Sequence, residues 1–197
     1  MLKTLTEDSL DLLFRRARSH NGWLDRPVDD DLLMQVYDLM KMGPTSVNSS
    51  PVRLLFLRSD EAKQRLRPAL SAGNIDKVMT APVVAIIAHD LAFHEKLPQL
   101  FPHNPGVASL FAANADLAEV TAFRNGSLQG AYFMLAARAL GLDCGPVSGF
   151  DAVAVNREFF AGGKLKVNFL CNVGFGDYSK IFPRSPRLDF AQACSLL

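Results

Sequence analysis

Residues 43–51 (GPTSVNSSP) concentrate side chains that can form hydrogen bonds between two prolines. The hydroxyls of Thr45 and Ser46 and the amide of Asn48 lie within four positions, and the prolines restrict the backbone around them. Such groups suit the polar edge of a bound small molecule. An ordinary surface loop, whose hydroxyls bond to its own backbone, is the alternative. Both interpretations stay open for this segment alone.

Two later segments carry similar groups. Asn74 and Lys77 are three residues apart and would project the same way from a helical turn. Pro146, Ser148 and Gly149 lie in a glycine-rich stretch, 144–151, that follows a long helical pattern without a strand. It is therefore predicted as a loop and not as a Rossmann phosphate loop. Amides, hydroxyls and a cation of this kind suit the edge of a planar heterocycle.

Basic side chains gather near both ends of the chain, and fixed cations of this kind can bind a phosphate. The first cluster is Arg15, Arg16 and Arg18, with Ser19 beside it, and the second is Arg184 and Arg187. A solvated charged surface is the alternative for each cluster.

Other catalytic templates are missing from the sequence. The four histidines, His20, His89, His94 and His103, form no HExxH motif, and no GxSxG, GxGxxG or GxxxxGK[ST] motif occurs. Cys144, Cys171 and Cys194 have no metal-ligand spacing. We therefore expect no metal and predict chemistry that depends on a bound organic cofactor.

The composition indicates one domain, residues 1–197, with no field that would attract nucleic acid or an anionic membrane. The 21 basic and 20 acidic residues give a net charge of +1, and 49% of the residues are hydrophobic. The high apolar fraction favours burial against a partner subunit. The longest strongly apolar run, 81–88, is too short to span a membrane. The three cysteines are odd in number and widely spaced, and the N-terminus has no signal-peptide pattern. Both features predict a cytoplasmic protein.

Apolar periodicity predicts a mixed α+β layered domain. We expect helices over 4–19, 29–42, 60–66, 117–140 and 152–160, and strands over 52–57, 82–88 and 166–175. The helix at 117–140 is apolar nearly all round, which predicts burial on almost every side. Residues 90–116 contain several prolines and are predicted to form an irregular insertion with a helical start.

The order of these segments resembles the FMN-dependent nitroreductase family over nearly the whole chain. Residues 44–51 resemble its Pro-Ser-Ser-x-Asn-x-Gln-Pro motif, 74–77 its Asn-x-x-Lys, and 145–151 its Pro-x-x-Gly-Phe-Asp loop. Residues 173–176 and the basic tail resemble its final strand and C-terminus. Residues 18–23, 43–46, 121–125 and 159–162 further resemble the malonic semialdehyde reductase branch, which acts in pyrimidine degradation. Ser50 and Val52 depart from the family's usual Gln-Pro-aromatic ending.

The resemblance implies an α+β nitroreductase-like fold with a central, mostly antiparallel sheet flanked by helices. It implies a domain-swapped homodimer with C-terminal strand exchange and FMN at the subunit interface. The residues that it assigns to FMN are Arg18, Ser19, Thr45, Ser46, Asn48, Asn74, Lys77, Pro146, Ser148, Gly149, Arg184 and Arg187. Of these, Thr45, Ser46 and Asn48 would come from the second subunit, and Lys77 would stabilise the reduced flavin electrostatically.

The implied activity is reduction of malonic semialdehyde to 3-hydroxypropionate, with NAD(P)H as donor and NADPH slightly favoured. A general nitro- or quinone reductase and a non-catalytic flavin-binding protein remain as alternatives. An acidic substrate would need a cation for its carboxylate. Arg53, His103 and Arg124 are the candidates for that contact or for proton donation.

Overall fold

One antiparallel sheet organises the protein in the computed structural model, which describes residues 3–197. Within the described residues, the strands of the sheet follow the order β1-β2-β4-β3, and every neighbouring pair is antiparallel. The strands are β1 (Val52–Leu57), β2 (Val83–Asp90), β3 (Asp143–Val147) and β4 (Leu165–Gly174). β2 lies at the centre, and its apolar run is buried on both faces. The predicted α+β class and the three predicted strands are confirmed.

The prediction of a loop over 144–151 is wrong at its start, because Asp143–Val147 forms β3. Glycine and proline disfavour strands, and this stretch contains Gly145 and Pro146. β3 is an edge strand, however, and an edge tolerates a residue without a backbone donor. Pro146 lies opposite Cys171 of β4 and stays exposed. The strand therefore depends on pairing with β4, which local sequence does not reveal.

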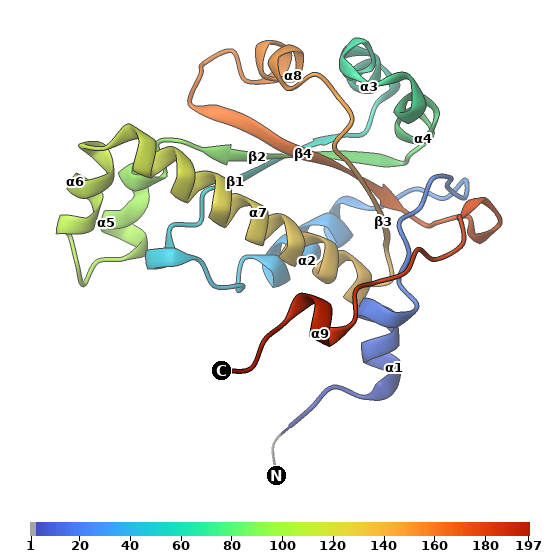
Figure 1. Cartoon of the computed structure of the whole chain (residues 1–197). Helices are drawn as coiled ribbons and strands as arrows, with labels where there is room; N and C mark the ends of the chain where they lie inside the picture. The colour runs from blue at the N-terminus through green and yellow to red at the C-terminus, as the bar shows by residue number, and fades with distance from the viewer. Residues whose placement is uncertain (1–2) are drawn as a thin grey trace.

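Helices cover both faces of the sheet (Figure 1). On one face, α2 and α7 pack against β2 side chains such as Ala85 and Ile87. On the other face, α3, α4 and α8 pack against Val84 and Ile86. The helices are α1 (Glu7–Leu10), α2 (Asp30–Met40), α3 (Asp60–Leu66), α4 (Ile75–Met79), α5 (Leu97–Leu100), α6 (Gly106–Ala112), α7 (Ala115–Ala139), α8 (Ala152–Phe159) and α9 (Phe190–Ala193). A π-helical turn, Asp11–Arg15, continues α1.

α7 is the longest helix, and it is less buried than its sequence predicts. Asn114 caps its start by accepting a hydrogen bond from the Leu117 N–H. Val120 and Phe123 are 51% and 53% exposed, so the expectation of burial nearly all round is wrong on that side. The opposite side packs closely on the sheet, because a Cβ at Gly130 would lie 2.5 Å from the Phe169 ring.

The predicted helical start of the insertion at 90–116 is confirmed, but the rest of it is also largely helical and not irregular. It contains α5, α6 and a 3-10 turn, Phe93–Lys96. Phe93, Leu97 and Phe111 form a small core of their own against Ala118 and Ala122 of α7. The prolines of this segment therefore begin and separate short helices rather than prevent them.

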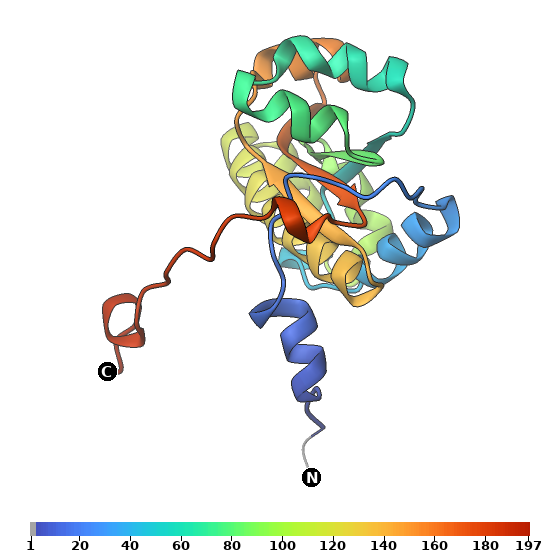
Figure 2. The same cartoon turned by 90° about the vertical axis from the view of Figure 1, so that its right-hand side faces the viewer.

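Both ends of the chain project from the body of the protein (Figure 2). The first helix and the segment after β4 meet near their bases, where Arg184 donates to the carbonyls of Arg15 and Ala17, both at 2.7 Å. The C-terminal segment exposes Phe182 just before that contact and Leu188 and Phe190 after it. Among residues 3–197, no helix has the length and apolar character needed to cross a membrane.

Candidate functional site

Two of the predicted segments meet at the end of β3. The Asn74 side-chain amide donates to the Gly149 carbonyl at 2.7 Å, and the Ser71 N–H donates to the same oxygen at 3.1 Å. Asn74 also precedes α4, which carries Lys77. Asn74 and the stretch of Pro146, Ser148 and Gly149 therefore form one continuous surface.

This surface presents backbone donors that the described residues leave unused. The N–H groups of Ser148 and Gly149 follow β3 directly and have no acceptor within residues 3–197. A Cβ at Gly149 would lie 2.4 Å from the Asn74 Nδ2, so a larger residue here would displace the Asn74 side chain. Two adjacent unpaired N–H groups form a site for an acceptor atom or an anion.

Lys77 supplies a cation on α4, three residues after Asn74. Its backbone carbonyl accepts hydrogen bonds from Trp23 Nε1 and Asn172 Nδ2, both at 3.1 Å. Its half-buried ammonium has no hydrogen-bond or ion-pair partner in the described part of the chain. The fold thus fixes the backbone of Lys77 and leaves its charge available.

Arg18, Ser19 and Arg184 gather at the other end of β3. Ser19 pairs with Cys144 through an isolated bridge, and the Arg18 guanidinium donates to the Phe182 carbonyl. Arg184 reaches the same region through its contacts with the first helix. Arg187 instead donates to its neighbours Ser185 and Pro186. The structure therefore places Arg184 near Arg18 and leaves Arg187 outside this group.

His20 and Asp143 support this end of β3, and neither is among the residues predicted for the site. The buried His20 Nε2 lies 3.3 Å from Asp143 Oδ1, and the Gly176 N–H donates to Asp143 Oδ2 at 2.9 Å. Burial pushes the pKa of Asp143 up, but contact with His20 and the Gly176 N–H outweighs it and leaves the pKa below its usual value. Contacts between residues this far apart in the chain leave no local sequence signal. The one available hint is Gly176, which belongs to the family-like motif at 173–176.

The loop at 43–51 is held in place mainly by α7. The Ser46 N–H donates to Asn125 Oδ1 at 2.8 Å, and the Tyr132 hydroxyl donates to the Pro44 carbonyl at 3.0 Å. Asn48 donates its side-chain amide to Leu100 of the insertion at 2.8 Å. The loop is thus a fixed surface and not a loose connection.

The backbone of this loop is strained. Val47, Asn48 and Ser50 have φ angles of 48°, 49° and 40°, in the left-handed region that disfavours residues with a Cβ. A β-branched residue such as Val47 is especially unusual there. Each such residue costs about 1–3 kcal/mol, and strain of this kind clusters at functional sites. Nothing in the residue types predicts this strain.

Within one protomer, this loop does not join the other predicted residues. It leads into β1, whereas Pro146, Ser148 and Gly149 follow β3 at the opposite edge of the sheet. β2 and β4 lie between the two edges, a separation of roughly 14 Å at the usual strand spacing. The predicted residues therefore form two groups: the β3-edge group (Arg18, Ser19, Asn74, Lys77, Pro146, Ser148, Gly149 and Arg184) and the loop group (Thr45, Ser46 and Asn48).

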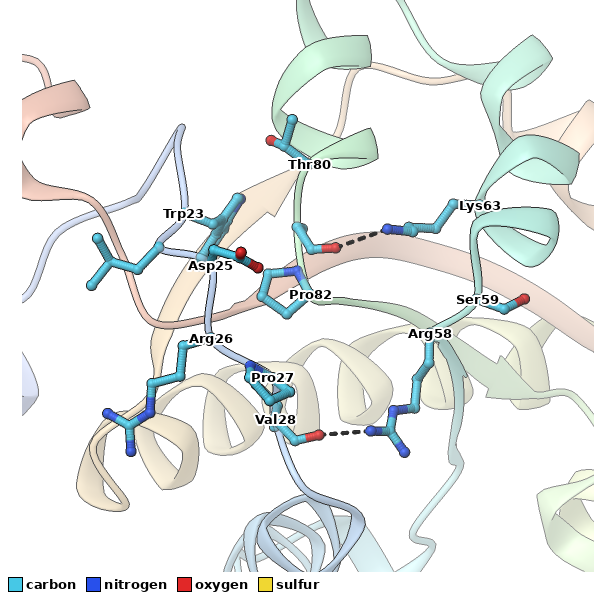
Figure 3. A pocket seen from close by; sticks show the side chains of 12 residues that line it. Trp23, Asp25, Arg26, Pro27, Val28, Arg58, Ser59, Lys63, Thr80 and Pro82 are labelled. Atoms are coloured by element: carbon cyan, nitrogen blue, oxygen red, sulfur yellow. Dashed lines mark hydrogen bonds between the residues drawn. The ribbon is translucent and has the colours of Figure 1, made fainter.

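A separate cavity of about 680 Å³ is lined by Arg26, Arg58, Lys63 and Trp23, among others (Figure 3). None of the predicted site residues lines it. The buried Lys63 ammonium donates to the carbonyls of Met79 and Ala81, and Arg58 donates to the Val28 carbonyl. These cations serve the local structure, so the cavity is not the predicted site.

Comparison with known proteins gives consistent matches. A family model described as "Nitroreductase family" matches residues 14–175. The chain is 58% identical over 193 residues to a "Putative NADH dehydrogenase/NAD(P)H nitroreductase" of Cupriavidus pinatubonensis, covering 97% of this chain and 98% of the relative. It is 60% identical over 190 residues to the similarly named HadB of Ralstonia pickettii, covering 95% and 97%.

The fold also matches a solved structure. A crystal structure of a nitroreductase-type protein from Exiguobacterium sibiricum, in complex with FMN, superposes with a TM-score of 0.85 at 19% identity and covers 100% of both chains. The nitroreductase-like fold that the resemblance implies is confirmed.

Proposed function

The chain belongs to the nitroreductase family, and on this premise we propose that it is an FMN-dependent NAD(P)H oxidoreductase. The observation that carries the proposal is the β3-edge group. Two unused backbone donors and an exposed proline lie on one surface with the Asn74 amide, and the unpaired Lys77 follows three residues after Asn74. This set matches the polar edge and flat face of a flavin. The solved relative from Exiguobacterium sibiricum contains FMN.

The residues of the β3-edge group divide between the two ends of FMN. The N–H groups of Ser148 and Gly149 would donate to the ring, and Pro146 would pack on it. Asn74 and Lys77 would hold the pyrimidine edge, where the ammonium favours the negative charge of the reduced state. Arg18, Ser19 and Arg184 would bind the phosphate end, since guanidinium groups and hydroxyls suit phosphate oxygens.

When bound, FMN supplies hydride transfer from NAD(P)H to an acceptor. The chain would hold the ring in place, keep one face open for the two substrates in turn and supply the charge that favours reduction. We propose NADPH as the slightly favoured donor and a cytoplasmic location for the reaction.

We propose that the loop group belongs to the site of a second copy, in a homodimer. The loop is preformed and strained, yet it lies across the sheet from the β3-edge group of its own protomer. Exposed apolar residues on α7 and the projecting C-terminal segment offer the surface that a second copy would cover. Thr45, Ser46 and Asn48 would then line the flavin bound at the partner's β3 edge.

The C-terminal segment has a matching surface beside β1. A groove of about 810 Å³ follows this edge strand and is lined by Met34, Tyr37, Leu54 and Phe56, among others. The segment after residue 181 exposes Leu188, Phe190 and Leu196. We propose that this segment of the partner lies in the groove and adds a strand to β1, whose outer edge is open in the described protomer.

For the acceptor, we propose malonic semialdehyde, which would be reduced to 3-hydroxypropionate in pyrimidine degradation. Support comes from the segments at 18–23, 121–125 and 159–162 that resemble the corresponding branch of the family. The names of the two relatives favour general nitro- or quinone reduction as the second candidate.

The test begins with the purified protein. We expect bound FMN, visible as a yellow colour, that bleaches when NADPH is added without oxygen. The bleached enzyme is then mixed with malonic semialdehyde, a nitroarene or a quinone, and the return of colour is timed. Fastest reoxidation by the semialdehyde supports the proposed acceptor, and fastest reoxidation by the nitroarene or quinone supports the second candidate. A colourless protein that does not take up added FMN would contradict both.

A further inference from the structure

Arg124 interrupts an apolar stripe on α7. The exposed residues Leu117, Val120, Arg124, Leu128 and Ala131 follow one another at intervals of three or four positions and so share one side of the helix. The Arg124 guanidinium has no hydrogen-bond or ion-pair partner in residues 3–197. A single unpaired cation stands in the middle of an otherwise apolar surface.

Arg124 also lies at the level of the loop group. Its neighbour Asn125 accepts the hydrogen bond from the Ser46 N–H and donates to the Thr121 carbonyl. Consecutive helix residues differ by about 1.5 Å along the axis. The loop that we assign to the partner's flavin is therefore bonded to the same turn of α7 that carries Arg124.

A guanidinium on this surface needs an anion once a second copy covers it. Removing an unpaired charge from water costs more than the neighbouring apolar side chains gain. The dimer must therefore place Arg124 opposite a carboxylate of the partner or at the open side of the partner's site, where an acidic substrate would pair with it.

The other candidates for an acidic substrate are already engaged. Arg53 donates to Asp90 Oδ2 at 2.7 Å and to the carbonyls of Ser50 and Val52. The ring of His103 packs on Phe101 with a centroid distance of 3.9 Å. Arg124 is the member of this set whose charge stays available.

We propose that Arg124 is a specificity-determining residue that binds the carboxylate of a short acidic acceptor at the partner's flavin. The inference rests on the proposed function and on the homodimer. A guanidinium matches a carboxylate through two parallel hydrogen bonds. Arg124 would thus hold the acid end of the substrate while its carbonyl end lies over the flavin, and a neutral acceptor would gain nothing from it.

The test compares one acid with its neutral ester. FMN-loaded wild type, Arg124→Ala and Arg124→Lys are assayed with 3-oxopropanoate and with its methyl ester. We expect the ratio of kcat/KM for acid over ester to fall about tenfold or more in Arg124→Ala, mainly through KM, and partly to recover in Arg124→Lys. Arg157→Ala, which removes another exposed arginine on α8, should leave the ratio at the wild-type value.

A binding measurement complements the kinetics. Binding of 3-hydroxypropanoate to the FMN-loaded dimer, followed by ligand-observed NMR, should weaken in Arg124→Ala to the same degree. An unchanged acid-to-ester ratio with unchanged binding would overturn the assignment. So would dimer dissociation in Arg124→Ala with equal loss for acid and ester, because Arg124 would then pair with the partner chain. If the wild type binds FMN but reduces neither compound, the carbonyl-reductase proposal fails, and the binding comparison still decides the role of Arg124.

Discussion

The two edges of the sheet contribute differently to the proposed site. At the β3 edge, the backbone donors of Ser148 and Gly149 and the ammonium of Lys77 are unused, and the framework behind them holds them in place. Before β1, the backbone N–H groups of Ser46 and Ser50 and the side-chain amide of Asn48 are used: they donate to Asn125, to Thr45 and to Leu100 of the insertion. The β3 edge offers backbone donors and a cation, whereas the loop offers side chains on a rigid and strained backbone.

This difference indicates a division of labour. The β3 edge would provide most of the affinity for FMN, and the loop would close the site from the partner subunit. Variants at the two edges should therefore fail in different ways, and the expected effects decrease from the β3 edge to the loop.

The largest effect is expected for Lys77→Glu. The change replaces an unpaired cation of the proposed flavin site with an anion and should weaken FMN binding about 100-fold, measured by flavin fluorescence titration. Lys164→Glu, which alters the net charge equally at an exposed pair with Glu95, is the control and should bind FMN normally. Equal FMN affinity in both variants would show that Lys77 does not contact the flavin.

Gly149→Ala should weaken FMN binding about tenfold. The added Cβ would lie 2.4 Å from Asn74 Nδ2 and would disturb both the Asn74 hydrogen bond and the free donors. Gly73→Ala lies in the same region, and its Cβ would have no atom within 4 Å. Comparing the FMN affinities of the two variants separates the effect of this close contact from a general loss of backbone freedom. Wild-type FMN affinity in Gly149→Ala would contradict the proposed role of this turn.

Asn125→Ala tests the loop. Loss of its Oδ1 leaves the Ser46 N–H without its acceptor and should lower the free energy of unfolding by about 1–3 kcal/mol, with a smaller loss of FMN affinity than at the β3 edge. Asn114→Ala removes the cap of the same helix and should cost about 1 kcal/mol without any change in FMN affinity. Chemical denaturation and flavin titration of both variants give the comparison.

The smallest expected effect is the change in stability as the pH falls. His89 lies opposite Val52 at the β1 side, and burial, with the charge of Lys166 adding to it, lowers its pKa. The unfolded chain therefore takes up a proton at a higher pH than the folded chain, and stability should fall as the pH drops below about 6.5. Asp143 beside β3 has a lowered pKa, so its contribution is present above about pH 4 and disappears only in stronger acid.

Urea unfolding at several pH values measures this difference. His89→Gln should flatten the fall in stability in mild acid, whereas His103→Gln at an exposed position should leave it unchanged. The same slope in His89→Gln and wild type would show that another group controls the response.

Residue types predict much of this fold, and they fail where contacts are distant. The continuous apolar run of β2 and the stripe of α2 are local signals, and both elements form as predicted. β3 was missed because Gly145 and Pro146 disfavour a strand until β4 pairs with it. The exposed side of α7 was missed because apolar residues mark a subunit surface as well as a core. The residues of the β3-edge group were predicted from motifs, but the support from His20 and Asp143 and the strain at Val47 exist only in the folded chain.

The central claim is that each flavin site combines the β3 edge of one protomer with the loop of the other. Lys77→Glu blocks the first, and Ser46→Trp, at an exposed loop position that contributes only its N–H to Asn125, blocks the second. The two variants are co-expressed with different tags, the mixed dimer is isolated, and its FMN content is measured. We predict about half of the wild-type FMN content, because one of its two sites receives both wild-type edges and the other receives neither. FMN content no higher than the average of the two parent variants would contradict the claim and place each site within a single protomer.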